Sequence, residues 1–243
     1  MNRIIAGPNQ VEEAIRANVP VQVIYIQSGL SQKTAARIFT LATKRNIRTQ
    51  SVEKQHILDL AENLNHQGIV AICGEFKYWD LESLIEKLSV NNPRSLLLVL
   101  DQLQDPGNLG AILRSAHSLG ANGVIITKDR SAQVTAAAVR ASAGASERIP
   151  VVRVVNLAAT MDRLRDAGFH LMGTAMHGAA AIDEIDWPDK TVVVLGNEGK
   201  GIRRLTAQKC DSLFRIPMTG NFESLNVSAA AAIVLYEIQR YHR

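Results

Sequence analysis

The sequence predicts an α/β protein whose larger part is a parallel β-sheet covered by helices on both faces. Continuous apolar runs of strand length, among them LLLVL at 96–100, alternate with segments of helical period. Strands of a parallel sheet are buried on both faces and have this apolar character. With 243 residues, 47% of them hydrophobic and 21% charged, the chain can bury a substantial core in one large or two modest domains.

The first part of the chain predicts a small α/β unit. Apolar runs of strand length lie at 21–26 and 68–73, and segments of helical period lie at 11–17, 32–45 and 54–60. The pattern then changes, because KYWDLESLIEKLSVNN mixes charges with a short amphipathic period and precedes a proline. We therefore predict a first domain over 1–76, a linker over 77–93 and a second domain over 94–243.

The second domain repeats the alternation more strongly. Its apolar runs lie at 96–100, 124–126, 151–155 and 192–195, and its helical segments at 110–119, 133–143 and 157–167. Strand, helix and strand in succession form the pattern of a doubly wound sheet. Ligands of such sheets bind at the carboxyl ends of the strands, so the loops that follow the strands are the first place to look for a site.

The charge of the chain is compatible with a nucleic-acid partner without identifying one. The net charge is +4 and the pI is near 9.2. The densest basic cluster, Lys44, Arg45 and Arg48, lies at the end of the helix predicted over 32–45. Cations also suit the C-terminal end of a helix dipole. A solvated helix end and a contact with phosphates therefore both remain open for this cluster.

The positions of the cysteines and histidines argue against a metal centre and against a disulfide framework. Cys73 and Cys210 are far apart and outside any CxxC spacing, so we expect two buried thiols. The six histidines form no HxxxH or HxxEH pattern, which disfavours metal catalysis and a serine-histidine-acid site. We expect a soluble, cytoplasmic protein, since the N-terminus lacks a signal-peptide pattern and no apolar run reaches about 18 residues.

The first of three unusual loops is DQLQDPGNLGAILR, at 101–114, directly after the LLLVL strand. Its proline and glycines predict a tight turn from strand to helix. Asn108 occupies a position typical of a helix N-cap or of an exposed amide, and Arg114 can point back over the loop.

The other two loops follow later strands. LGNEGKG, at 195–201, has three glycines that let backbone N–H groups approach a ligand closely, and it contains Glu198. IPMTGNFESLNVS, at 216–228, leads into the final helix, with Ser224 as its predicted N-cap and Asn226 in its first turn. One glycine-rich turn alone is often only a turn.

The three loops together favour a group transfer that needs no metal. Neither GxGxxG nor GxxxxGK[ST] occurs, so the spacing of a dinucleotide site or a P-loop is absent. The polar side chains at the predicted strand ends are Asn, Arg, Glu and Ser, without a carboxylate pair or a pairing histidine.

These residues resemble the three ordered motifs of the SpoU (TrmH-like) branch of the SPOUT methyltransferases. The matching segments are DPGNLG at 105–110 with Arg114, LGNEGKG at 195–201, and IPM at 216–218 followed by SLNVS at 224–228. They occur in the order and at the spacing of the family. Two further segments, NHQGIVA at 65–71 and KDRSAQ at 128–133, are similar to RlmB-type members. His66, in the first of these, is interpreted as a structural or RNA-contact residue.

The resemblance implies ribose 2′-O-methylation of RNA with S-adenosylmethionine as methyl donor. RlmB-type members methylate a guanosine in 23S, large-subunit, ribosomal RNA, and their front domain resembles ribosomal protein L30e. A C-terminal trefoil knot is also implied, although general folding rules would reject one. The same resemblance implies a homodimer formed through the knotted region.

The resemblance also implies a cofactor site. The residues that it places around the cofactor are Gly196, Ile216 and Leu225, through their backbones, with Asn197, Gly201, Met218 and Asn226 nearby.

Arg114 is the first candidate for a catalytic role. A ribose hydroxyl is a very weak acid that must lose its proton as the new bond forms. The resemblance gives Arg114 the role of base, which conflicts with a guanidinium that stays protonated. We predict instead that Arg114 holds the target phosphate and stabilises the developing oxyanion, while water or a phosphate oxygen takes the proton.

The remaining candidates have structural alternatives. Glu198 is predicted to orient Arg114 or to bind a guanine edge, and it could instead satisfy backbone N–H groups of its own loop. Asn108 and Asn226 are predicted to position the ribose or the loops. Ser224 either contributes to the site or only caps the final helix.

Two other functions remain open at this stage. SpoU relatives also modify transfer RNA, and only 5% of the residues are aromatic, so no stacking platform for particular bases is evident. A relative that has lost its chemistry and only binds RNA is the second alternative, which the intact motifs disfavour.

Overall fold

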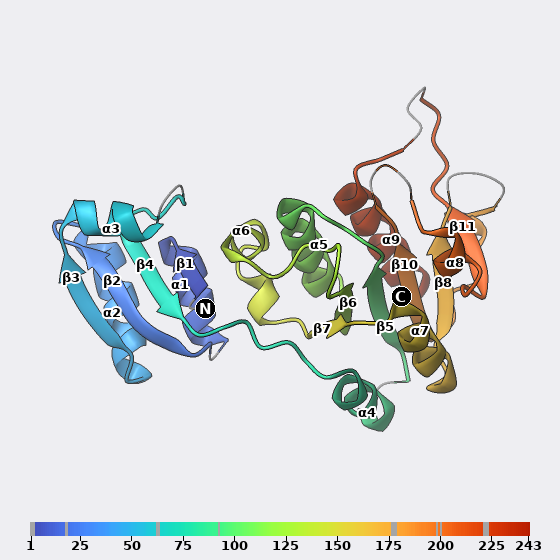
Figure 1. The fold of residues 1–243 in the computed structure, drawn as a ribbon, viewed down its shortest axis with the longest axis horizontal. Helices are drawn as coiled ribbons and strands as arrows, with labels where there is room; N and C mark the ends of the chain where they lie inside the picture. The colour runs from blue at the N-terminus through green and yellow to red at the C-terminus, as the bar shows by residue number, and fades with distance from the viewer. Residues whose placement is uncertain are drawn as a thin grey trace.

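The computed structural model describes residues 3–17, 19–61, 64–91, 93–175, 179–197, 199, 201–220 and 224–243. Within these ranges two β-sheets organise the chain, a four-stranded one near the N-terminus and a seven-stranded one in the remainder (Figure 1). The predicted α/β class with a parallel sheet is confirmed.

The first sheet is mixed, with helices packed on both of its faces. Its elements are β1 (Arg3–Ala6), α1 (Pro8–Arg16), β2 (Val21–Gln27), α2 (Gln32–Lys44), β3 (Arg48–Val52), α3 (Lys54–Ala61) and β4 (Ile69–Cys73). The strand order is β1-β4-β2-β3; β4 pairs antiparallel with β1 and β2, and β2 pairs parallel with β3. Val11 of α1 and Ile38 of α2 pack on one face, and Ile57 of α3 packs on the other.

The second sheet has seven strands in the order β7-β6-β5-β10-β8-β11-β9, and each neighbouring pair is parallel. Its strands are β5 (Ser95–Leu100), β6 (Gly123–Thr127), β7 (Val151–Val154), β8 (His170–Thr174), β9 (Ala180–Ala181), β10 (Lys190–Leu195) and β11 (Ser212–Arg215). All the carboxyl ends therefore lie along one edge of this sheet.

Helices cover both faces of the second sheet. They are α4 (Leu81–Asn91), α5 (Pro106–Ser118), α6 (Ala136–Ala141), α7 (Leu157–Asp166), α8 (Arg204–Ala207) and α9 (Val227–Tyr241), with short 3₁₀ turns η1 (Ala145–Glu147) and η2 (Ile182–Glu184). Along β5, Leu98 packs with α5 and α9, whereas Leu97 packs with α4 and α7. Successive side chains of a strand point to opposite faces, so this central strand is apolar throughout.

The segment predicted as a linker over 77–93 contains the helix α4. Leu84 and Leu88 of α4 are 0% and 3% exposed and pack against the second sheet. Their spacing of one helical turn gives α4 an apolar side, and burial of that side ties the segment to the following sheet.

Side chains join the two sheet-containing parts. The Arg3 guanidinium pairs with the Glu147 carboxylate at 2.5 Å, and both side chains are more than nine-tenths buried. Arg3 also lies over the Phe76 ring, 5.1 Å from its centroid. A second pair, between Glu13 and Arg148, has an Nε to Oε2 distance of 2.6 Å and is much more exposed.

Loss of the buried pair should destabilise the fold far more than loss of the exposed one. Glu147→Ala leaves the Arg3 charge buried without its partner, which typically costs about 3–5 kcal/mol. Glu13→Ala removes a carboxylate from the same interface at a partly exposed position and serves as the control. Urea unfolding of the unchanged protein and of the two variants measures the loss of stability in each variant. Equal stability of the two variants would contradict this role of Arg3 and Glu147.

Candidate functional site

The loops predicted from the sequence meet at the carboxyl edge of the second sheet. Asp105 is the N-cap of α5, because its Oδ2 accepts a hydrogen bond of 2.7 Å from the backbone N–H of Asn108. The prediction that Asn108 occupies the N-cap was wrong by three residues. Pro106 explains the difference, since proline suits the first position of a helix and so places the cap immediately before it.

A similar correction applies to the last helix. The N-cap of α9 is Asn226, whose Oδ1 accepts a hydrogen bond of 2.9 Å from the backbone N–H of Ser228. Ser224 lies before the helix and does not cap it. The Asn226 amide also donates to Oδ1 of Asn108 at 3.1 Å. The two asparagines therefore connect the N-terminal ends of α5 and α9.

Mutation can separate the two roles of Asn226, which are the cap of α9 and the hydrogen bond to Asn108. Asn226→Ala removes the cap, and we expect the free energy of unfolding to fall by about 1 kcal/mol. Asn226→Asp keeps an oxygen acceptor for the Ser228 N–H but loses the amide donor to Asn108, so its stability should stay close to that of the unchanged protein. Denaturant unfolding compares them, and an alanine variant of undiminished stability would contradict the capping role.

The loop after β10 closes on itself through its backbone. The N–H groups of Asn197 and Gly201 donate to each other's carbonyl oxygens at 3.1 and 2.9 Å. The Asn197 side chain donates to the Gln102 carbonyl at 3.1 Å and accepts from the Gly199 N–H at 3.0 Å. A β-carbon at Gly196 would lie 1.9 Å from the Gly201 carbonyl carbon, so only glycine fits there.

A pocket of about 110 Å³ lies between this loop and the segment that precedes α9. The predicted site residues that line it are Gly196, Asn197, Ile216, Met218, Ser224 and Leu225. Met218 and Leu225 are 41% and 38% exposed, so the pocket offers apolar side chains beside the backbone of a glycine-containing loop. The structure thus brings together residues from two motifs that are far apart in the sequence.

Other predicted site residues lie outside the lining of this pocket. Asn108 and Asn226 form the contact between helix ends described above, and Gly201 closes the loop with Asn197. Arg114 is exposed on α5 and does not line the pocket. Glu198 falls outside the described residues.

Residues in and beside the site that were not singled out from the sequence include Thr174, Ala175 and Asp101. Thr174 and Ala175, at the end of β8, line the pocket. The Asp101 side chain is 0% exposed and accepts hydrogen bonds from the Arg203 backbone N–H at 3.1 Å and from its Nε at 2.8 Å. An aspartate directly after an apolar strand is the sequence signal that could have identified Asp101.

The two thiols take no part in this pocket. Burial raises the pKa of Cys73 and of Cys210 to about 12, so both stay protonated at neutral pH. Cys73 is fully buried, as predicted, whereas Cys210 is partly exposed. Among the residues described, no group of three or more His, Cys, Asp or Glu is placed to hold a metal ion. None of the helices described has the length and apolar character that a membrane crossing requires.

Comparison with known proteins decides the family. A model of the SpoU rRNA methylase family matches residues 95–236, which include all three loops. The chain belongs to the SpoU rRNA methylase family. A second model, described as the substrate-binding part of RNA 2′-O ribose methyltransferases, matches residues 4–79. SpoU family membership identifies the chain as an RNA methyltransferase.

Relatives of this SpoU methylase match it over almost its whole length. A protein of Staphylococcus aureus, provisionally described as a TrmH family tRNA/rRNA methyltransferase, is 39% identical over 98% of this chain and 95% of its own. The crystal structure of the SpoU methyltransferase AviRb from Streptomyces viridochromogenes with AdoMet has a TM-score of 0.82 and 28% identity, over 99% of this chain and 90% of that one. An AdoMet-bound rRNA methyltransferase from Sinorhizobium meliloti has a TM-score of 0.82 and 26% identity, over 99% and 87%.

Proposed function

We propose that this SpoU methylase transfers a methyl group from S-adenosylmethionine to a ribose 2′-hydroxyl of RNA. The observation that carries the proposal is the pocket at the carboxyl edge of the parallel sheet, where residues of the second and third motifs converge. AdoMet is bound in two solved structures that this chain resembles over nearly its full length, which supports the same cofactor here.

The pocket residues suit this cofactor. When bound, S-adenosylmethionine supplies an activated methyl group on a sulfonium sulfur, so no metal is needed. Apolar Ile216, Met218 and Leu225 provide surfaces for its adenine and its aliphatic part. Gly196 lines the pocket, and its lack of a β-carbon lets the loop close tightly against the Gly201 backbone beside the pocket.

The residues of the chain must align the ribose oxygen and manage its charge. With the cofactor bound, the ribose oxygen would gain the methyl group as the bond between the methyl carbon and sulfur breaks, and the hydroxyl proton would leave to water or to a phosphate oxygen. We assign Arg114 to the target phosphate and to the developing oxyanion, because a guanidinium stays protonated and presents several donors. Asn108 and Asn226 hold the two helix ends in register. Glu198 is assigned to the orientation of Arg114 or to a guanine edge.

We further propose that the enzyme acts as a homodimer through its C-terminal region, with the chain there tied in a trefoil knot. Two observations support the dimer. Ile233 and Tyr236 of α9 are 40% and 54% exposed, which leaves an apolar surface on this helix. Arg114, moreover, does not line the pocket of its own chain, which is consistent with a dimer in which a second copy supplies the arginine to each site.

The proposed substrate is a guanosine of 23S ribosomal RNA in the cytoplasm, with transfer RNA as the second candidate. The N-terminal part is interpreted as L30e-like. It also matches a substrate-binding family, and both points favour an RNA contact there. The exposed cluster Lys44, Arg45 and Arg48 adds positive charge to the surface of that part. The Staphylococcus aureus relative is described for both RNA classes, which keeps transfer RNA in view.

Mapping of 2′-O-methyl groups in cells that lack this protein tests the substrate. Loss of one methylated guanosine in large-subunit ribosomal RNA, restored by the unchanged gene, is the expected result. Loss of a transfer RNA methyl group would support the second candidate. Persistence of every site, together with binding of RNA and AdoMet by the purified protein, would favour a catalytically silent relative.

A further inference from the structure

A second, larger depression lies along the same edge of the parallel sheet. Its volume is about 1000 Å³, the upper end of the range of roughly 300–1,000 Å³ for small-molecule sites. It is lined by the segments that follow β5, β6 and β7, by the start of α7, and by α8. We call it the flanking groove. None of the described residues that line the cofactor pocket lines this groove.

We propose that the flanking groove binds the single-stranded RNA next to the nucleotide that is methylated. This inference rests on the proposed function and adds a place for the substrate. The two depressions are adjacent, because Asn197 of the pocket donates a hydrogen bond of 3.1 Å to the carbonyl of Gln102 in the groove. A strand with its target ribose at the pocket therefore reaches the groove with its neighbouring nucleotides.

One wall of the groove is a braced loop that presents Arg130. The Gln133 amide donates to the carbonyls of Thr127, Lys128 and Ser131 at 3.2, 3.2 and 3.0 Å. Inside this brace Arg130 has a φ of 55°, a left-handed conformation that non-glycine residues rarely adopt. Gln102, at the end of β5, has a φ of 60° and lines the same groove. Such backbone conformations persist where the surrounding structure enforces them, often at binding sites.

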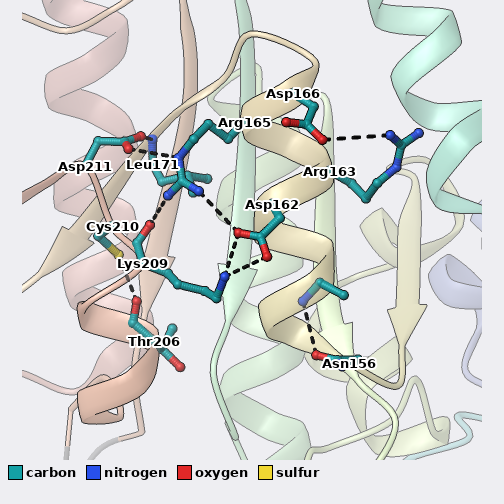
Figure 2. A network of polar contacts seen from close by, with 11 residues as sticks. Asn156, Asp162, Arg163, Arg165, Asp166, Leu171, Thr206, Lys209, Cys210 and Asp211 are labelled. Atoms are coloured by element: carbon teal, nitrogen blue, oxygen red, sulfur yellow. Dashed lines mark hydrogen bonds and ion pairs between the residues drawn. The ribbon is translucent and has the colours of Figure 1, made fainter.

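Another part of the lining is α8, which charged side chains fix to its neighbours. Buried Asp101 binds Arg203 at the start of α8. Lys209 pairs with both carboxylate oxygens of Asp162 on α7, each at 2.6 Å, and Arg165 joins Asp162 to Asp211 (Figure 2). Figure 2 shows this network spanning α7 and the segment after α8. This part of the lining is thus held in place, which lowers the entropy cost of binding a ligand.

Asp129 is an exposed acidic residue in the lining of the groove, whereas several other exposed groups there match a nucleotide strand. Arg130 and Arg204 are exposed, and within the described part of the chain neither has an ion-pair partner, so both are available to phosphates. Val155 and Leu205 are 75% and 68% exposed in the same groove and offer apolar contacts. Guanidinium planes can also stack on unpaired bases. Cations combined with surfaces for base faces are the features that bind single-stranded RNA.

The test is a binding titration of the full chain with two arginines neutralised. The double variant Arg130→Gln with Arg204→Gln is titrated with a fluorescent, unstructured RNA of about twelve nucleotides at several salt concentrations. We expect roughly tenfold weaker binding and a salt slope shallower by about 1.4, since each lost phosphate contact on a single strand contributes about 0.7. Calorimetric binding of AdoMet should not change.

A matched variant separates the groove from net charge. Arg94→Gln with Arg163→Gln removes two exposed arginines of the same part of the chain from outside the groove, where each is in a surface ion pair. This control should bind the RNA as the unchanged protein does. Equal RNA affinity of the groove variant, an equal loss in the control, or no RNA binding by the unchanged protein would overturn the proposal. Failure of the unchanged protein to bind AdoMet would instead count against the proposed function.

Discussion

Arg114→Ala is expected to slow methyl transfer by about 10²–10³-fold, the usual effect of removing one group that stabilises an oxyanion. AdoMet affinity should remain as it was, because Arg114 does not line the pocket. Its exposed position on α5 also predicts no loss of stability. Single-turnover methylation measures the rate of methyl transfer, and calorimetry of the same preparation measures the AdoMet affinity. A variant that loses cofactor binding together with activity would contradict this role.

Arg114→Lys distinguishes a clamp from a base. A lysine keeps the charge but lacks the planar, bidentate geometry of arginine, so a phosphate clamp should stay impaired at every pH. If the residue acted as a base, a rise in pH would partly restore the rate of the lysine variant. A pH profile of kcat that stays low up to alkaline pH is the expected result.

Mixing two inactive variants tests whether Arg114 acts across the proposed dimer. In a heterodimer of Arg114→Ala and Gly196→Ala, one site combines an intact pocket with an intact arginine from the other copy. Random mixing should therefore restore about a quarter of the sites, since half of the dimers are mixed and each has one competent site. No recovery after subunit exchange would show that Arg114 serves its own chain.

Gly196→Ala should abolish cofactor binding. The added methyl group would lie 1.9 Å from the carbonyl carbon of Gly201 and 2.1 Å from the backbone nitrogen of Ile202, and neither backbone atom can move without opening the loop. We expect AdoMet affinity to fall by about a hundredfold or more, because loop and pocket share the backbone of residues 196 and 197.

Gly199→Ala is the control for this substitution. In the same loop, the one described atom within 4 Å of a β-carbon at Gly199 is Oδ1 of Asn197, at 3.8 Å, which is an ordinary contact. This variant should bind AdoMet almost as the unchanged protein does. Calorimetry measures the AdoMet affinity of both variants. Similar affinities of Gly196→Ala and Gly199→Ala would mean that the closed loop has no part in the cofactor site.

The sequence predicted the central strands well because their side chains are buried on both faces. β5, β6 and β10 are continuous apolar runs, as expected for the middle of a parallel sheet. The strands that were missed are β1, β3 (RTQSV), β8, β9 and β11 (SLFR). β3 has no fully buried side chain and β11 has one, Phe214, so neither shows a periodic signal. Pairing with neighbouring strands determines these two strands, and that is tertiary information.

The sequence predicted which loops form the candidate site, but it did not predict how their residues are arranged in space. The family resemblance placed Gly196, Ile216 and Leu225 together, and the structure gathers them around one pocket. Helix starts were less certain, because Ser224 and Asn226 are both good capping residues and only the fold selects one. The position of Arg114 relative to the pocket depends on how α5 packs, which no spacing along the chain records.

The most direct test of the central claim is methylation of RNA by the purified protein with labelled AdoMet. Total RNA from cells that lack the protein is the substrate, and the product is hydrolysed with alkali. A 2′-O-methyl group blocks alkaline cleavage of the adjoining phosphodiester bond, so the account predicts label in an alkali-resistant dinucleotide that begins with guanosine. Label in alkali-released mononucleotides would show methylation of a base, and it would contradict the account.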